Sequence, residues 1–293
     1  MEYSFSIVTD TSSNLPKAVL DKYNIDVIPF TFFIDCDERT CTDIDSFDMK
    51  TFYDNMRNGT RVSTSQINPN TYEHFFRERL EKGQDILFIS MSSGISGSYN
   101  CSEIAANTLK AHFPDRKIRL IDTLGASLGE GLFAIEAAKM RDAGADIDEI
   151  YNKFKDSRYE MCQVFTVGDL TYLKNTGRLS NIAALVGMVL HIKPVLKGNN
   201  FGKIVSFAKL RGRKKAIEAL AEYYDKYVRD SGSQTIGIAH ADCESDAQYL
   251  ISLLKKNNPP LDIMTVCYEP VTGSHVGPGT LALFFMGNRK FRD

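Results

Sequence analysis

The residues best suited to chemistry lie in one short stretch, where five serines surround two glycines between positions 90 and 98. The apolar run 86–89 before it predicts a strand buried on both faces, and helical spacing of apolar residues predicts a helix over 99–110. Backbone N–H groups at a helix N-terminus lack partners within the helix, and the helix dipole favours negative charge there. The stretch therefore predicts an anion-binding site, although a capped turn that binds nothing is the alternative.

A second candidate is the sequence Gly125-Ala-Ser127-Leu-Gly129, which matches the G-x-S-x-G pattern of serine hydrolases. In that class a histidine accepts the proton of the serine, and His275 follows downstream. The pattern is short, no glycine-rich oxyanion loop precedes it, and Thr123 and Leu124 separate it from its strand. A serine hydrolase or esterase that uses Ser127 with His275 is therefore the alternative function.

Weaker signals come from three other positions. Asp10 follows the first predicted strand, but Ser12 stands where an aspartyl phosphotransferase needs its second aspartate, which excludes that reaction. His275 is flanked by glycines, as functional and turn histidines are, and Arg178 is either an anion contact or a surface arginine. The sequence contains neither G-x-G-x-x-G nor a P-loop, so it supports no nucleotide cofactor.

Composition narrows the class of protein. The 293 residues are 43% hydrophobic and 25% charged, which is ordinary for one large or two average globular domains. A net charge of −2 favours neither nucleic acid nor an anionic membrane surface as a partner. No apolar run approaches the ~20 residues of a membrane span, and the N-terminus has no signal-peptide pattern, so a cytoplasmic protein is expected. Six scattered cysteines predict reduced thiols and no metal site.

Strands alternate with helices in the first half of the chain. The patterns predict strands at 5–9, 27–34, 86–89 and 118–122, and helices at 16–23, 48–56, 70–82, 99–110, 128–142 and 147–157. Residues 61–69 read as a polar connection. The alternation predicts a parallel sheet covered by helices. Ligands bind such sheets beyond the carboxyl ends of the strands, where the loops 10–14, 90–98 and 123–129 are expected to gather.

The second half has adjacent strands and longer helices. Strands are predicted at 163–167, 193–196, 203–209, 235–240 and 263–268, and helices at 170–174, 181–190, 213–228 and 245–256. The expected fold class is α/β, with an N-terminal parallel-sheet domain over residues 1–158 and a C-terminal α+β domain over residues 159–293.

Five segments, taken together, resemble the DegV family of bacterial fatty-acid-binding proteins. They occur in the order of the family and span nearly the whole chain: Val8–Leu15, Ser63–Gln66, Met91–Tyr99, Tyr172–Ser180 and Gly273–Gly279. Two departures are small. Ile67 stands where the family often has proline, and Ser98 stands where threonine is common.

The resemblance implies two α/β domains with a long-chain fatty acid, such as palmitate, buried between them. Its carboxylate would be bound by Thr64, Ser96 and Gly97, with His275 near the head group. Arg178 and Ser65 are further candidates for contact with the head group or with a partner protein. The family also implies that 125–129 is an ordinary turn, which weakens the hydrolase alternative.

The resemblance further implies a carrier that is not itself an enzyme. In relatives of this type the bound acid is presented to a separate ATP-dependent fatty acid kinase, which forms the acyl phosphate. For the acyl chain, the sequence offers apolar surface at 182–190, 195–196 and 281–286. The small residues Ala183, Ala184 and Gly187 would leave room for the chain on the predicted helix. Burial of the tail is worth about 0.8 kcal/mol per CH₂, so it would dominate affinity.

Overall fold

A computed structural model describes residues 3–180 and 192–293, and the chain divides into two compact units. The first unit consists of Met1–Phe47 and Ser63–Arg158, and the second of Asp48–Val62 and Tyr159–Asp293. Residues 48–62, which the sequence analysis places in the N-terminal domain, therefore pack with the C-terminal part of the chain.

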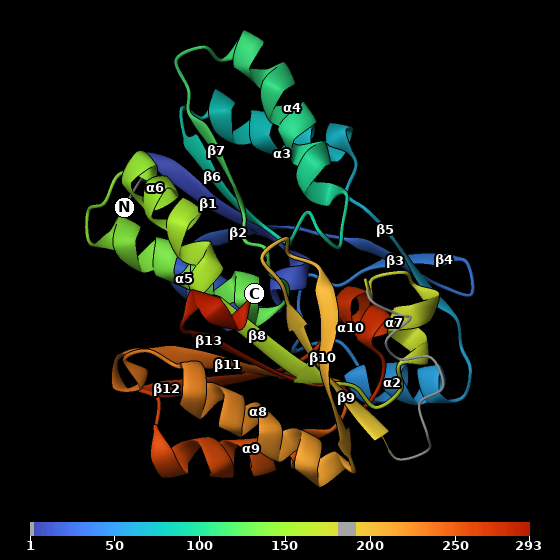
Figure 1. Ribbon diagram of the computed structural model, residues 1–293. Helices are drawn as coiled ribbons and strands as arrows, with labels where there is room; N and C mark the ends of the chain where they lie inside the picture. The colour runs from blue at the N-terminus through green and yellow to red at the C-terminus, as the bar shows by residue number, and fades with distance from the viewer. Residues whose placement is uncertain (1–2, 181–191) are drawn as a thin grey trace. The chain divides into compact units, whose positions relative to one another are not determined.

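The first unit is built on a four-stranded parallel sheet in the order β2-β1-β6-β7. Its strands are β1 (Phe5–Asp10), β2 (Ile25–Ile28), β6 (Asp85–Ser90) and β7 (Ile118–Asp122). Its helices are α1 (Lys17–Tyr23), α3 (Pro69–Glu81), α4 (Ser98–His112), α5 (Leu128–Asp142) and α6 (Ile147–Ser157), with a short 3₁₀ turn η1 (Thr11–Ser13) after β1. Figure 1 shows α3 and α4 on one face of this sheet and α5 and α6 on the other. The predicted parallel sheet covered by helices is thus confirmed.

Local sequence signals explain where these elements begin and end. The Asn68 side chain accepts the Thr71 N–H at 3.0 Å and Pro69 opens α3, a favourable pair at a helix start. Five of the six residues of β6 are buried because helices cover both faces of the sheet. Tyr72 and Phe76 of α3 pack on Phe88 of β6 with ring centroids 5.2 and 5.7 Å apart, which fixes α3 against the central strand.

A small sheet in the order β4-β3-β5 differs from the sequence expectation. It comprises β3 (Thr31–Ile34), β4 (Asp37–Thr40) and β5 (Val62–Ser65). The single strand predicted at 27–34 is divided into β2 and β3 at Pro29, which has no N–H for a sheet ladder. The prediction that 61–69 is only a connection is wrong, because β5 lies within it. Neither β4, whose side chains are all exposed, nor β5 carries an apolar pattern that would have revealed it.

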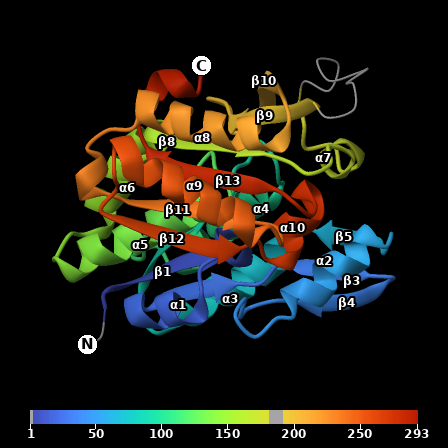
Figure 2. The same ribbon diagram turned by 90° about the horizontal axis from the view of Figure 1, so that it is seen from below.

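The second unit contains a six-stranded mixed sheet in the order β10-β9-β8-β13-β11-β12. Its strands are β8 (Met161–Thr166), β9 (Ile192–Gly198), β10 (Ile204–Arg211), β11 (Thr235–His240), β12 (Asp262–Cys267) and β13 (Leu281–Met286). Its helices are α2 (Met49–Arg57), α7 (Thr171–Asn175), α8 (Arg213–Tyr227), α9 (Glu244–Asn257) and α10 (Pro270–Val276), with short 3₁₀ turns at Arg158–Glu160, Ser231–Ser233 and Arg289–Phe291. Strands β11 and β12 pair in parallel, and the other neighbours pair antiparallel. Figures 1 and 2 show α8 and α9 side by side on one face of this sheet.

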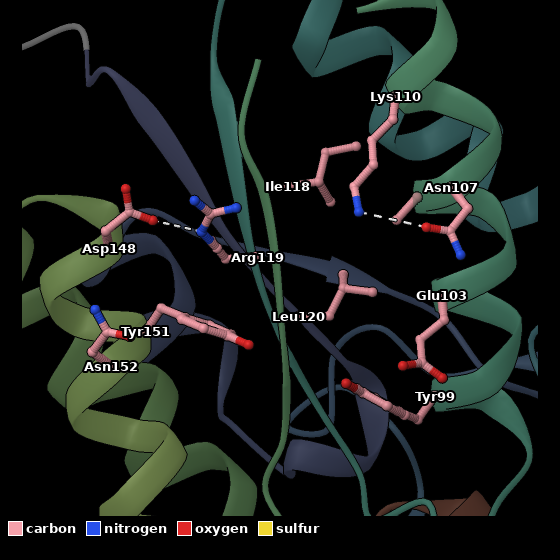
Figure 3. A pocket seen from close by; sticks show the side chains of 11 residues that line it. Tyr99, Glu103, Asn107, Lys110, Ile118, Arg119, Leu120, Asp148, Tyr151 and Asn152 are labelled. Carbon is pink, nitrogen blue, oxygen red and sulfur yellow. Dashed lines mark hydrogen bonds and ion pairs between the residues drawn. The ribbon is translucent and has the colours of Figure 1, made fainter. Parts of the chain in front are cut away.

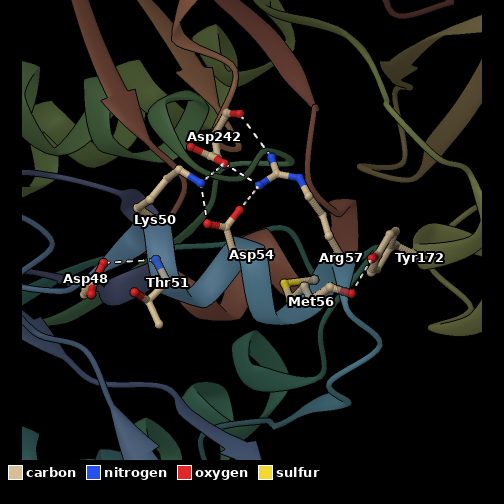
Figure 4. Close-up of polar contacts among 8 residues, drawn as sticks. All are labelled: Asp48, Lys50, Thr51, Asp54, Met56, Arg57, Tyr172 and Asp242. Carbon is tan, nitrogen blue, oxygen red and sulfur yellow. Dashed lines mark hydrogen bonds and ion pairs between the residues drawn. The ribbon is translucent and has the colours of Figure 1, made fainter.

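Helix α2 is fastened to the rest of the second unit by polar contacts (Figure 4). The Tyr53 hydroxyl donates to the Tyr268 carbonyl at 2.7 Å, deep in the unit. Arg57 pairs through one nitrogen with Asp54 at 2.8 Å and with Asp242 at 2.5 Å. Since Asp242 follows β11, these bonds tie α2 to the six-stranded sheet. Arg57 and Asp242 are 185 residues apart in the sequence.

Several sequence expectations concern residues outside the described part of the chain. The predicted helix at 181–190, with Ala183, Ala184 and Gly187, falls there. In the described residues, Val195 of β9 and Leu281 of β13 belong to the hydrophobic core of the second unit. The helices of the described residues include none that is long and apolar enough to span a membrane.

Candidate functional site

The hydroxyl-rich turn between β6 and α4 is held largely by its own serines. The Ser92 carbonyl accepts the N–H groups of Ile95 and Ser96, each at 3.2 Å, and the Ser92 hydroxyl accepts the Gly94 N–H at 3.0 Å. The Ser93 hydroxyl donates to Asp122 Oδ2 at 2.5 Å. Serines 92 and 93 therefore shape the turn. Part of its high serine content thus serves hydrogen bonds that hold the turn together, apart from any contact with a ligand.

The end of the turn, residues 96–98, keeps donors for a ligand. The Ser98 N–H donates to Ser96 Oγ at 3.2 Å, and the two hydroxyl oxygens are 3.0 Å apart. Ser98 is fully buried, whereas Ser96 is partly exposed. Within residues 3–180 and 192–293 the Gly97 N–H has no hydrogen-bond partner, and it lies at the N-terminus of the 15-residue helix α4. An oriented hydroxyl beside a free N–H and a helix N-terminus is suited to a carboxylate.

The Ser63–Gln66 segment, which the sequence analysis singled out separately, packs against this turn. The Ile67 N–H donates to Ser98 Oγ at 3.2 Å, and Gln66 Nε2 contacts Cys101 Sγ at 3.4 Å. A Cβ at position 97 would lie 2.2 Å from Gln66 Oε1, so a glycine is needed for this close approach. Two of the motifs that were separate in the sequence are therefore neighbours in the first unit.

Ile67 explains one departure from the family pattern. Its side chain is buried, and its N–H makes the bond to Ser98 that a proline could not make. Thr64 lies on β5 and is partly buried, while Ser65 is exposed at the end of that strand. The bond from Ile67 therefore fixes the path of the chain that carries Thr64.

His275 lies on helix α10, although its flanking glycines are typical of a turn. The Glu269 carboxylate caps this helix by accepting the N–H groups of Val271 and Thr272 at 2.6 and 2.5 Å. A Cβ at position 273 would lie 2.1 Å from the Tyr53 hydroxyl. The glycine at position 273 therefore does not expose the backbone next to His275, because the space of the missing side chain is filled by a tyrosine.

His275 and Arg178 are electrostatic neighbours in the second unit. Burial, with the charge of Arg178 acting in the same direction, lowers the pKa of His275 to about 4. Arg178 donates to the Thr176 carbonyl, and burial also lowers the pKa of its guanidinium. At neutral pH the imidazole is therefore uncharged and lies near a partly buried cation.

The first unit also contains a buried pair of acids that the motif analysis missed. Asp10 and Glu130 are both fully buried. The Ser12 hydroxyl oxygen lies 2.5 Å from Asp10 Oδ1 and 2.9 Å from Glu130 Oε2. Burial raises the pKa of Asp10 to about 6, and it raises the pKa of Glu130 well above its usual value, with the charge of Asp10 acting in the same direction. A signal for Asp10 was available, since an acid that directly follows a buried strand faces the ligand edge of a parallel sheet.

Ser127, the nucleophile of the hydrolase alternative, has part of the expected geometry. Its backbone has φ 55° and ψ −137°, a strained conformation typical of a residue between a strand and a helix in a nucleophile elbow. The hydroxyl is buried and, within the described residues, has no hydrogen-bond partner. A serine nucleophile needs a base within hydrogen-bond reach, so this geometry does not favour hydrolysis.

A cavity of about 580 Å³ lies among α4, β7 and α6 of the first unit (Figure 3). It is lined by Tyr99, Glu103, Ala106, Asn107, Lys110, Ile118, Arg119, Leu120, Asp148, Tyr151 and Asn152. Arg119 Nε and Asp148 Oδ1 are 2.5 Å apart across part of its wall. Because much of the lining is charged or carries amides, the cavity does not suit an apolar acyl chain. It contains none of the residues proposed for the carboxylate.

Comparison with known proteins identifies relatives along almost the whole chain. The sequence matches the family described as "Uncharacterised protein, DegV family" over residues 4–288. A DegV domain-containing protein of Clostridium perfringens (strain 13 / Type A) is 39% identical over 290 residues, which cover 98% of each chain. Another, from Streptococcus pyogenes serotype M3 (strain SSI-1), is 31% identical and covers 97% of this chain and 98% of its own.

Solved structures also resemble this chain over almost its whole length. One, described as DegV, a fatty acid binding protein from Bacillus subtilis, has a TM-score of 0.83, 27% identity and coverage of 98% of this chain and 100% of its own. A protein from Thermotoga maritima, described as revealing a fatty acid binding function, has a TM-score of 0.84 with the same identity and coverage. The family match and the two relatives above 30% identity show that this chain belongs to the DegV family.

Proposed function

We propose that this protein binds a long-chain fatty acid and holds its carboxylate through Thr64, Ser96 and Gly97, with His275 near the head group. The observation that carries the proposal is the end of the turn after β6, where the oriented Ser96 hydroxyl and the Gly97 N–H lie together at a helix N-terminus. The fatty-acid-binding descriptions of the relatives from Bacillus subtilis and Thermotoga maritima support the choice of ligand.

Arg178 and Ser65 complete the proposal as contacts with the head group or with a partner protein. A carboxylate gains most from a cation that water screens poorly, and the guanidinium of Arg178 is partly buried. The neutral His275 beside it would gain a proton when a carboxylate arrives, because an opposite charge nearby favours the charged imidazolium. The two residues would then bind the anion together.

We further propose that the protein is a carrier and not an enzyme, and that it presents the bound carboxylate to a separate ATP-dependent fatty acid kinase. The absence of any nucleotide-binding motif from the sequence agrees with a second protein supplying the ATP site. The unactivated hydroxyl of Ser127 agrees with a protein that does not hydrolyse its ligand.

Fatty-acid binding is tested with Thr64→Ala and Ser96→Ala. Loss of a hydrogen bond to a charged group costs about 1.5–3 kcal/mol, so each variant should bind palmitate roughly 10- to 150-fold more weakly. The measurement is displacement of a fluorescent fatty acid, together with native mass spectrometry of the purified protein to detect a bound lipid.

Ser63→Ala is the matched control, because Ser63 is exposed on the same strand as Thr64. It should bind palmitate like the wild type. Unchanged affinity in both Thr64→Ala and Ser96→Ala would refute the assignment of the carboxylate site.

Presentation to a kinase is tested with His275→Ala. Tail burial dominates affinity, whereas phosphoryl transfer requires the carboxylate to be positioned within about 1 Å. The variant should therefore lose more acyl-phosphate formation, measured with a fatty acid kinase and ATP, than it loses palmitate affinity. An equal loss in both measurements would make His275 a simple ligand contact.

A further inference from the structure

Asp10, Ser12 and Glu130 form a buried group at the carboxyl end of β1. The Ser12 N–H donates to Asp10 Oδ1 at 2.9 Å, and the Thr9 hydroxyl donates to Glu130 Oε1 at 2.6 Å. The Ser12 hydroxyl oxygen is within 2.9 Å of both carboxyl groups, since it lies 2.5 Å from Asp10 Oδ1 and 2.9 Å from Glu130 Oε2. This single hydroxyl therefore bridges two acids.

The bridge requires a proton that the hydroxyl alone does not have. A serine hydroxyl has one hydrogen and can donate to one carboxylate, while an ionised carboxylate only accepts. If both acids were ionised, one of the two short contacts would place oxygen lone pairs against each other without a hydrogen. Both contacts are satisfied when one carboxyl is protonated and donates to Ser12, which in turn donates to the other carboxylate.

The surroundings offer no other charge to balance two anions. In the described part of the chain, neither Asp10 nor Glu130 forms an ion pair with a lysine, arginine or histidine. The titratable group that faces them from α3 is the buried Tyr72 phenol, whose pKa both carboxylates raise. Cys101 of α4 acts on Tyr72 in the same direction. Tyr72 is therefore neutral, and it supplies no positive charge that would balance a second anion.

The acid pair is connected to the proposed carboxylate site. The Met91 N–H, at the first residue of the turn that ends in Gly97, lies close enough to Asp10 to favour its ionised form. Tyr72 lies beside both Asp10 and Ser98, and Ser98 contacts Ser96. The pair therefore lies next to the first residue of the turn, and Tyr72 neighbours both the pair and Ser98 near its end.

We propose that Asp10 and Glu130 share one proton through Ser12 at neutral pH, and that this protonated pair positions the carboxylate-binding turn. The proton itself follows from the hydrogen count, whereas its role in binding rests on the proposed function. Loss of the proton at high pH adds a negative charge near the turn and leaves one of the two Ser12 contacts without a hydrogen. Affinity for a fatty acid then falls. The raised pKa values of Asp10 and Glu130, caused first by burial, agree with the shared proton.

Infrared spectroscopy of the ligand-free protein tests the proton directly. A protonated carboxyl group has a C=O stretching band that ionised carboxylates lack. The wild type should show this band at pH 7, and Glu130→Gln and Asp10→Asn should each remove or shift it. Glu136→Gln, which changes a partly exposed glutamate on the same helix, should leave the band unchanged.

Absence of the band from the folded wild type at pH 7 would overturn the shared proton, and so would a band that neither Glu130→Gln nor Asp10→Asn alters. Circular dichroism establishes that each variant is folded. If the Glu130 variant does not fold, the pH titration of the wild-type band decides the question by itself.

The positioning role is tested by palmitate affinity between pH 6 and pH 9. The wild type and Glu136→Gln should lose roughly three- to tenfold in affinity as the pH rises, since a like charge is added near the site. The Glu130→Gln variant should lose much less palmitate affinity over the same pH range. The same difference should persist when His275→Gln is present in both proteins, which separates the acid pair from the histidine.

The outcomes separate the two proposals. Equal pH dependence with and without Glu130→Gln would overturn the positioning role. A protein that shows the band but binds no fatty acid at any pH would refute the proposed function and, with it, the positioning role, while the shared proton would stand.

Discussion

Ser127 illustrates the difference between matching a motif and having its chemistry. The residue has the positive φ of an elbow, but its hydroxyl is buried and, in the described residues, without a hydrogen-bond partner. A buried hydroxyl without a partner contributes desolvation cost and no bond. The side chain is therefore dispensable for the fold and, in our proposal, for the function.

We predict that Ser127→Ala changes the free energy of unfolding by less than about 1 kcal/mol, or raises it, because no hydrogen bond is lost. Palmitate binding should be retained, and neither protein should hydrolyse short acyl esters above background. Ser92→Ala is the comparison, since the buried Ser92 hydroxyl accepts the Gly94 N–H and its loss should destabilise the turn. Ester hydrolysis that disappears in Ser127→Ala would restore the hydrolase alternative.

At the residue level, the sequence predicted candidates but not their environments. The turn after β6 was found because apolar residues, serines and glycines follow each other locally. The pairing of Asp10 with Glu130 could not be found in this way, because 120 positions separate them and only the packing of α5 on β1 brings them together. The roles of Thr64, Ser96, Gly97 and His275 in carboxylate binding remain predictions.

Helix α10 shows how an element can depend on one missing side chain. Position 273 lies on this helix, and a Cβ there would meet the Tyr53 hydroxyl of α2 at 2.1 Å. The same hydroxyl donates to the buried Tyr268 carbonyl at 2.7 Å. The glycine therefore allows α2 and α10 to approach closely and allows the tyrosine to reach its acceptor.

Gly273→Ala should destabilise the protein by about 1–3 kcal/mol, the usual cost of overpacking a filled core. The measurement is urea unfolding, with Gly232→Ala as control because a Cβ at position 232 meets no atom within 4 Å. In a Tyr53→Phe background, Gly273→Ala should reduce the stability by a smaller amount, because the oxygen that the new Cβ would clash with is gone. Additive losses in the double variant would contradict this account of the contact.

Elements with strong periodicity were predicted to within a few residues, and elements without it were not. The helices expected at 128–142 and 147–157 have those bounds in the structure. Helix α10 was missed because it has seven residues and includes a glycine, which has low helix propensity. Its Glu269 cap and its packing on Tyr53 stabilise it instead, and neither is visible as a periodic pattern.

For the whole molecule, the buried acids make stability depend on pH in an unusual direction. Burial raises the pKa of Asp10 from 3.8 to about 6 in the folded chain. The folded state therefore binds this proton more tightly than the unfolded state does. The resulting stabilisation is complete below about pH 4 and is lost as the pH rises through about 6. Most paired surface carboxylates act in the opposite direction.

The prediction is a difference between the wild type and Asp10→Asn. The stability of the wild type relative to this variant should fall by on the order of 3 kcal/mol between pH 4 and pH 7. Chemical unfolding at several pH values measures it. Asp45→Asn, at an exposed position of the first unit, should show no such trend. A constant difference between wild type and Asp10→Asn over this range would show that Asp10 titrates normally.

The placement of α2 in the second unit has a consequence for synthesis on the ribosome. Tyr53 is made early, but its acceptor Tyr268 follows 215 residues later. At about 5–20 residues per second, helix α2 waits roughly 10–40 s for the strands and helix that bury it. Until synthesis reaches Tyr159, where the second unit resumes, Phe52, Tyr53 and Met56, which are buried in the finished protein, lack the later residues of their own unit. A nascent chain of this length is therefore expected to bind chaperones that shield apolar helices.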